Sequence, residues 1–126
     1  MSIVHDNIIQ SFSVDFENET LIIKTDETDV IFTGYLTHIF RCEVKNSIIL
    51  DIEEFPLNNF IISESKSLNE LKSSGWHILS GYETESDLLN YLQINKYRAF
   101  LISASVGLNG WVLAKQTNID IHKWCI

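Results

Sequence analysis

The sequence contains few of the residues that interrupt regular structure. Its 126 residues include only one proline and five glycines, too few for a long flexible or proline-rich linker. We find no internal repeat and no low-complexity segment. The length is near the commonest domain size, and 45% of the residues are hydrophobic. We therefore expect residues 1–126 to form a single domain with a substantial core.

Targeting signals and cysteine motifs are also missing. The first ten residues, MSIVHDNIIQ, have no basic region followed by a long apolar run, which argues against a signal peptide. No apolar stretch approaches the ~20 residues that a membrane span needs. Cys42 and Cys125 are far apart and fit no CxxC pattern, so free thiols are favoured over a disulfide. These features predict a cytoplasmic protein.

Basic residues are scarce in the first half of the chain. Residues 1–64 contain 12 acidic and 3 basic side chains, whereas residues 65–126 contain 5 acidic and 6 basic ones. Nearly all of the net charge of -8 therefore lies in the first half. Such a charge repels phosphates and disfavours nucleic acid or an anionic membrane as a partner. It favours a basic protein instead.

The first half has the alternating pattern of antiparallel strands. Apolar and polar residues alternate over residues 11–16, and a second apolar strand follows at Leu21–Thr25. Pairing Phe16 with Leu21 brings the apolar faces together. That register leaves a four-residue polar hairpin loop, Glu17–Thr20.

A longer apolar pattern follows. It predicts one continuous strand over Val30–Val44 and another over Ile48–Glu54. Opposed residues must share a face, so a three-residue loop, Lys45–Ser47, is expected to join them as a hairpin. That register places Arg41 opposite Asp51 on the solvent face.

The period changes to that of a helix after Pro56. Helical spacing predicts a helix over 57–73 that is either continuous or broken near Ser65 and that is stopped by Gly75. A second helix is expected from Thr84 to about Asn95. Further strands are expected at 97–105 and 111–116, and at the tail 119–124. The predicted class is α+β, with a mainly antiparallel sheet of about six to seven strands and two helices packed on one face.

Three segments stand out together: the strand ending in Asp51–Glu54, the following helix with Phe60, and the segment Gly107–Ala114. They resemble a family of small uncharacterised bacterial proteins whose members are similar to immunity proteins encoded beside secreted polymorphic toxins. The resemblance covers roughly residues 10–116. It implies a cytoplasmic inhibitor that binds a toxin domain, and it carries over no catalytic residue.

The candidate catalytic groups are sparse. The four histidines are not at metal-ligand spacings such as HxxxH, so no metal or cofactor is predicted. His38 falls opposite Glu54 in the expected register. The two are either a catalytic dyad or, as we favour, a hydrogen-bonded structural pair. Trp111 is expected to pack in the core, or to anchor an interface if it is exposed.

The leading hypothesis is a non-enzymatic immunity or antitoxin protein that binds and neutralises a basic toxin. Two acidic loops, Glu17–Thr20 and Asp26–Asp29, are expected to form one acidic edge that complements a basic cleft. One alternative is a small-ligand module or enzyme with a pocket near His38 and Glu54. Another is a homodimer that pairs through the last strand. The predicted partner-binding residues are Glu17, Glu19, Asp26, Glu27, Asp29, Asp51 and Glu53.

Overall fold

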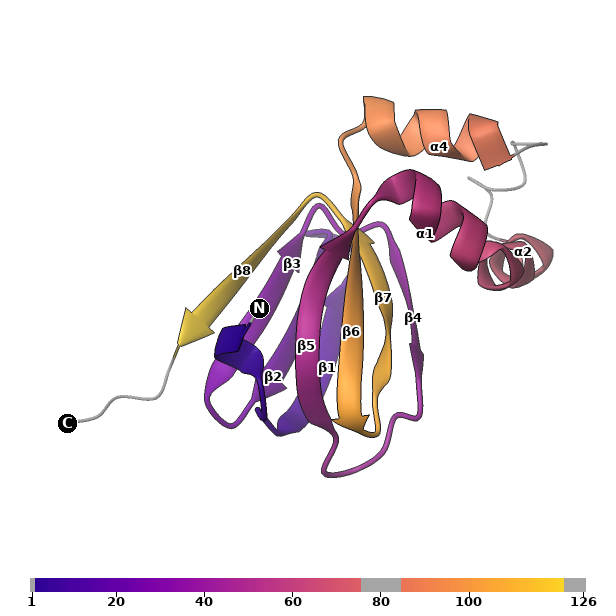
Figure 1. Cartoon of the computed structure of the whole chain (residues 1–126). Helices are drawn as coiled ribbons and strands as arrows, with labels where there is room; N and C mark the ends of the chain where they lie inside the picture. The colour runs from indigo at the N-terminus through magenta and orange to yellow at the C-terminus, as the bar shows by residue number, and fades with distance from the viewer. Residues whose placement is uncertain (1, 76–84, 122–126) are drawn as a thin grey trace.

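Two four-stranded antiparallel sheets and a group of helices make up the described part of the chain. A computed structural model describes residues 2–75 and 85–121. The strand orders are β1-β2-β3-β8 and β4-β7-β6-β5 (Figure 1). The elements are η1 Ser2–Val4, β1 Ile9–Asp15, β2 Thr20–Thr25, β3 Thr28–Thr33, β4 Thr37–Arg41, β5 Ile48–Phe55, α1 Leu57–Ser63, α2 Ser65–Ser73, α4 Glu85–Ile94, β6 Arg98–Val106, β7 Asn109–Ala114 and β8 Gln116–Ile121.

The second sheet is covered on both faces. One face packs on the first sheet, where Phe100 and Val112 meet Phe32 in one core cluster. The other face packs under the helices, where Trp111 and Phe60 belong to a second cluster. Trp111 is therefore a core residue, only 1% exposed, and not an interface anchor. Because β6 and β7 bury side chains on both faces, they occupy the centre of their sheet.

The predicted α+β class with antiparallel pairing is confirmed, but the single sheet is wrong. Eight strands and three α-helices are present among the described residues, so the expected numbers were slightly low. The strands divide into two packed sheets, and the helices cover the outer face of only one of them.

The continuous strand predicted over Val30–Val44 is also wrong. It divides into β3 and β4, which belong to different sheets. The break lies at Gly34, whose φ of +63° is readily adopted only by glycine. A Cβ there would lie 2.7 Å from the Lys115 side chain. The chain therefore crosses from one sheet to the other at a residue that no larger side chain replaces without strain.

The predicted β4–β5 hairpin does not form. β7 and β6 lie between these strands, so Arg41 is opposite Asn109 and Asp51 is opposite Ser103. Residues 42–47 are instead a connection that passes from one edge of the sheet to the other. Ser47 holds this connection, because its hydroxyl donates to the Val44 carbonyl at 2.6 Å and accepts from the Leu108 N–H at 2.9 Å.

The β1–β2 hairpin has the predicted faces but another register. Leu21 is opposite Val14 and not opposite Phe16, a shift of two residues that leaves the inward and outward faces unchanged. The Asp15 carboxylate closes the turn early by accepting hydrogen bonds from the side-chain amide (2.7 Å) and backbone N–H (3.1 Å) of Asn18. Phe16 is consequently outside the strand and 78% exposed.

The predicted helix over 57–73 is confirmed together with its break. α1 and α2 are separated at Glu64, and Gly75 follows the end of α2. The second predicted helix corresponds to α4, although its expected first residue, Thr84, lies outside the described residues. Residues 122–124 of the expected tail strand also lie outside them. The described part of that tail belongs to β8, which pairs with β3. Among the described residues no helix has the length and apolar character to span a bilayer.

Candidate partner-binding surfaces

The two acidic loops do not form the single edge that we expected. Glu17 and Glu19 lie in the β1–β2 loop, whereas Asp26 and Glu27 lie in the β2–β3 turn, at the other end of β2. The six residues of β2 separate them, a length of about 17 Å at ~3.3 Å per residue. Each loop is a separate surface at its own end of the sheet.

The other predicted acids lie elsewhere. Asp29 is half-buried within β3, opposite Lys24 and Asp120. Asp51 and Glu53 lie on β5 and line a shallow pocket with His5. The seven predicted residues are therefore distributed over several regions, and no single surface contains them all.

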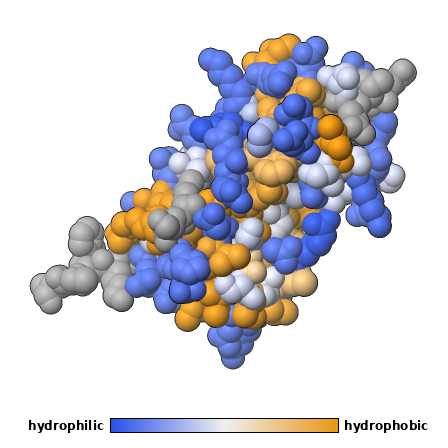
Figure 2. All heavy atoms as spheres, viewed as in Figure 1, coloured by the Kyte–Doolittle hydropathy of each residue, from blue (hydrophilic) through white to orange (hydrophobic). Residues whose placement is uncertain are grey.

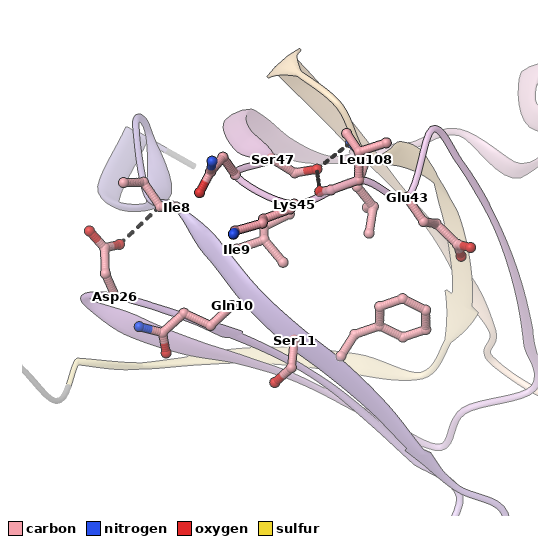
Figure 3. Close-up of a pocket in the computed structure, with 12 residues that line it drawn as sticks. Ile8, Ile9, Gln10, Ser11, Asp26, Glu43, Lys45, Ser47 and Leu108 are labelled. Atoms are coloured by element: carbon pink, nitrogen blue, oxygen red, sulfur yellow. Dashed lines mark hydrogen bonds between the residues drawn. The ribbon is translucent and has the colours of Figure 1, made fainter.

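Two acidic residues line a cleft of about 740 Å³. It lies between the first residues of β1 and the connection 42–47 (Figure 3). Asp26 lies on one side of it and Glu43 on the other, and Lys45 also lines it. Asp26 was predicted, whereas Glu43 was not, because the expected hairpin placed it within a strand far from Asp26.

An aromatic cluster extends from Phe12 in the lining of this cleft. The Phe12 ring, which lines the cleft, packs edge-to-face on Phe40 with their centroids 5.0 Å apart. His38 lies 4.7 Å from Phe40 between ring centroids, and its Nδ1 is 2.7 Å from the Tyr35 hydroxyl. Burial lowers the pKa of His38, and the charge of Glu43 opposes that shift only in part. His38 is therefore neutral near pH 7.

The expected pairing of His38 with Glu54 is wrong. His38 on β4 is opposite Val112 on β7, and Glu54 on β5 is opposite Phe100 on β6. These two strands are the opposite edges of the second sheet. The Glu54 carboxylate instead binds Arg98, with an oxygen–nitrogen distance of 2.6 Å. The alternative hypothesis placed a pocket near both residues, but the two lie at opposite edges of the sheet and not at one site.

The N-terminal segment closes one end of the cleft. The Asp6 N–H donates to the Ile49 carbonyl at 2.9 Å, and the Ile9 N–H donates to the Ser47 carbonyl at 2.8 Å. A single bridge also joins Ile8 to Ile48. This short antiparallel ladder ends at the pair Ile9–Ser47, because the connection 42–47 then diverges from β1. The remainder of β1 is an outermost strand of its sheet.

A buried polar network holds this segment in position. The Asn7 side-chain oxygen accepts a hydrogen bond from the Thr28 hydroxyl at 2.7 Å and lies 3.1 Å from the Thr25 hydroxyl. The Asn7 amide group donates to Glu27 at 3.1 Å. Since Asn7, Thr25 and Thr28 are at most 2% exposed, these bonds replace water and fix the cleft wall.

Apolar residues accompany the acids at this end of the molecule. Ile8 is 40% exposed and Val44 is 57% exposed, and both line the cleft. Figure 2 shows orange hydrophobic atoms at the surface of the two-sheet part of the molecule, interrupted by blue hydrophilic ones. An apolar surface with charged residues beside it is typical of protein-binding sites.

Metal-binding groups do not gather in the described ranges. No set of three or more His, Cys, Asp or Glu residues there is close enough to hold a metal ion. His77 and His122 lie outside those ranges. Cys42 is an exposed free thiol.

The comparisons with known proteins find no relative. The chain matches no family model, no curated protein and no solved structure.

Proposed function

We propose that this chain is a non-enzymatic binding protein of the immunity or antitoxin kind, which neutralises a basic toxin domain by covering its surface. The observation that carries the proposal is the cleft with Asp26 and Glu43 on its two sides and Phe12 and Ile8 among its lining residues. It combines negative charge with apolar area, as a surface that receives lysine or arginine side chains requires.

The charge of the whole chain supports a basic partner. A net charge of -8 accelerates the encounter with a positively charged protein and slows the approach of acidic ones. The cleft then supplies contacts after the encounter. Alkyl stems of long cationic side chains pack on Phe12, and their charged ends face Asp26 or Glu43.

The environment of His38 and Glu54 supports a structural role for both. Phe12, Tyr35 and Phe40 surround His38, and Arg98 binds Glu54. Neither group is oriented toward the other across a shared cavity. The alternative of an enzyme or small-ligand pocket at these two residues therefore loses the geometry on which it rested.

One observation favours a second candidate, a homodimer. β8 is the outermost strand of its sheet, and Ile121 on it is 47% exposed. A second copy is able to pair along such an edge. Sedimentation equilibrium at several concentrations separates the two candidates, since a homodimer doubles the mass and the Asn118→Lys variant restores the single-chain mass.

The main test is purification of the tagged chain from the cells that naturally produce it, followed by identification of any stoichiometric protein. We expect a basic protein whose toxicity or activity disappears when the purified chain is added at equal concentration. The variant Asp26→Lys/Glu43→Lys should lose this protection while its melting temperature stays within a few degrees of the parent. The matched control is Glu70→Lys/Asp87→Lys on the helices. An acidic partner, or a partner whose activity is unaffected by the chain, overturns the proposal.

A further inference from the structure

Resting on the proposed function, we infer that the partner contributes an extended cationic segment that adds to the free edge of β1 and places its side chains in the Asp26–Glu43 cleft. The inference specifies how the partner is held. It is a strand pairing through main-chain hydrogen bonds, with lysine or arginine as the specificity residues.

The structure already contains the beginning of this strand position. Residues 6–9 pair on their outer side with residues 47–49, through Ile9 N–H to the Ser47 carbonyl and through the Ile8–Ile48 bridge. Beyond Ile9 the connection 42–47 diverges, and the cleft lies in the space that it leaves. An incoming strand continues beside β1 from the point where the internal ladder ends.

The edge of β1 lacks the charges that normally prevent such pairing. Edge strands of native proteins are protected by lysine, proline or inward-pointing charges. β1 has the sequence IQSFSVD, in which the single charged residue is the last one, Asp15. Two of the other three outermost strands carry charges within them: β5 has Asp51, Glu53 and Glu54, and β8 has Asp120. β4 resembles β1 in that its Arg41 is the last residue of the strand.

The cleft selects cationic side chains. Successive side chains of an added strand alternate between the solvent and the space between the sheets. Those on the inner side meet Phe12, Asp26 and Glu43, all of which line the cleft. Lys45 also lines the cleft, and as the cation of its lining it opposes the entry of another. Removing the charge of Lys45 should therefore strengthen binding.

The test uses synthetic peptides and the full chain. The probe is a capped peptide of alternating lysine and valine, compared with the same peptide carrying glutamate in place of lysine, and with the lysine peptide N-methylated on alternate amides. Isothermal titration gives the affinities, and amide hydrogen exchange gives the site. We expect the lysine peptide to bind and to protect amides of β1, and both other peptides to bind at least about tenfold more weakly.

Matched variants locate the site. Ser13→Lys on β1 should weaken binding of the lysine peptide at least about tenfold, whereas Asn118→Lys, on the opposite edge strand β8, should leave it unchanged. Asp26→Asn/Glu43→Gln should weaken binding by a similar factor, and Lys45→Gln should strengthen it. Both Asp26 and Glu43 are exposed, so these variants are expected to fold.

Other results overturn the inference and are distinguishable from failure of the proposed function. Equal binding of the N-methylated peptide means that charge alone holds the segment, and equal binding of the glutamate peptide removes the cationic specificity. Absence of any binding excludes a cationic strand at this edge. A doubled mass of the chain that Ser13→Lys abolishes assigns the edge to a second copy. In each of these cases a folded basic toxin remains testable by the protection assay.

Discussion

The indole N–H of Trp111 donates a hydrogen bond of 3.0 Å to the Glu64 carboxylate. This contact joins the centre of the second sheet to the break between α1 and α2. The same oxygen of Glu64 lies 3.3 Å from the Ser67 hydroxyl, which accepts from Arg41 at 2.5 Å. Glu64, which separates α1 from α2, is thus a polar attachment of the helices to the sheet.

Replacing Glu64 should show the strength of this attachment. In Glu64→Leu the buried indole N–H loses its acceptor, which should lower the free energy of unfolding by about 1–3 kcal/mol. Glu64→Gln keeps an acceptor oxygen and should cost less than half as much. Urea unfolding measures both variants. A cycle with Trp111→Phe should give a coupling of about 1 kcal/mol, and a coupling near zero would refute the contact.

The Asn7 network should be essential for the N-terminal segment. Asn7→Ala leaves the hydroxyls of Thr25 and Thr28 without their shared acceptor, so we expect a loss of about 2 kcal/mol in the free energy of unfolding. Because the same segment forms a wall of the cleft, amides of residues 6–9 should exchange faster. Asn90→Ala, at an exposed position of α4, serves as the control. Equal losses in the two variants would contradict the role of the network.

The stability of the protein should decrease below neutral pH in a way that depends on His38. Burial lowers the pKa of His38 below its ordinary value of 6.5. The unfolded chain titrates at the ordinary pKa and the folded chain at the lowered one. Between these two pKa values the unfolded chain binds more protons than the folded one, so stability falls as the pH decreases through this interval. His38→Gln removes the titrating group and should flatten the pH dependence of the urea midpoint below neutral pH. An unchanged slope in the variant contradicts the assignment, and His5→Gln is the control at an exposed histidine.

The register of the first hairpin is testable by two serine substitutions. Phe16 is 78% exposed, so Phe16→Ser should change the free energy of unfolding by no more than about 0.5 kcal/mol. Phe12 packs on Phe40 and the core between the sheets, so Phe12→Ser should cost about 2 kcal/mol or more. The register that we expected from the sequence buries Phe16, and a large loss in Phe16→Ser would restore it.

Alternation along a strand is a local property, and it correctly places Phe32 and Ile52 in the core. The same alternation predicts that Leu50 faces inward, which is wrong: the register of β5 shifts between Ile48 and Asp51, so that Ile49 is buried and Leu50 is 45% exposed. The partner of each strand is not a local property. β4 and β5 satisfy the pairing rules as a hairpin, yet β6 and β7 separate them because those strands bury both faces. Likewise, Leu21 is able to pair with either Val14 or Phe16 without changing which face of the strand is buried. The hydrogen bonds between Asp15 and Asn18 in the turn select Val14.

The sequence predicted only one of the two acidic residues on the sides of the cleft. The cluster of acids in the first half indicated Asp26, whereas Glu43 joins it through the course of the connection 42–47. That course follows from the position of β7 and β6 between β4 and β5. A site that depends on the order of strands in a sheet has no signature in the spacing of its residues. Asp51 and Glu53 were indicated by the same excess of charge but lie at another surface.

The pairing of β3 with β8 has a consequence for the order of folding. Thr33 lies opposite Gln116 and Thr28 lies opposite Ile121, so this ladder joins residues distant in the sequence. Contacts of this kind slow folding because a large loop must close before they form. A nascent chain on the ribosome exposes the edge of β3 until β8 has emerged. During that interval β3 is available to other unfolded chains, and prompt docking of β8 limits the time in which aggregation can begin.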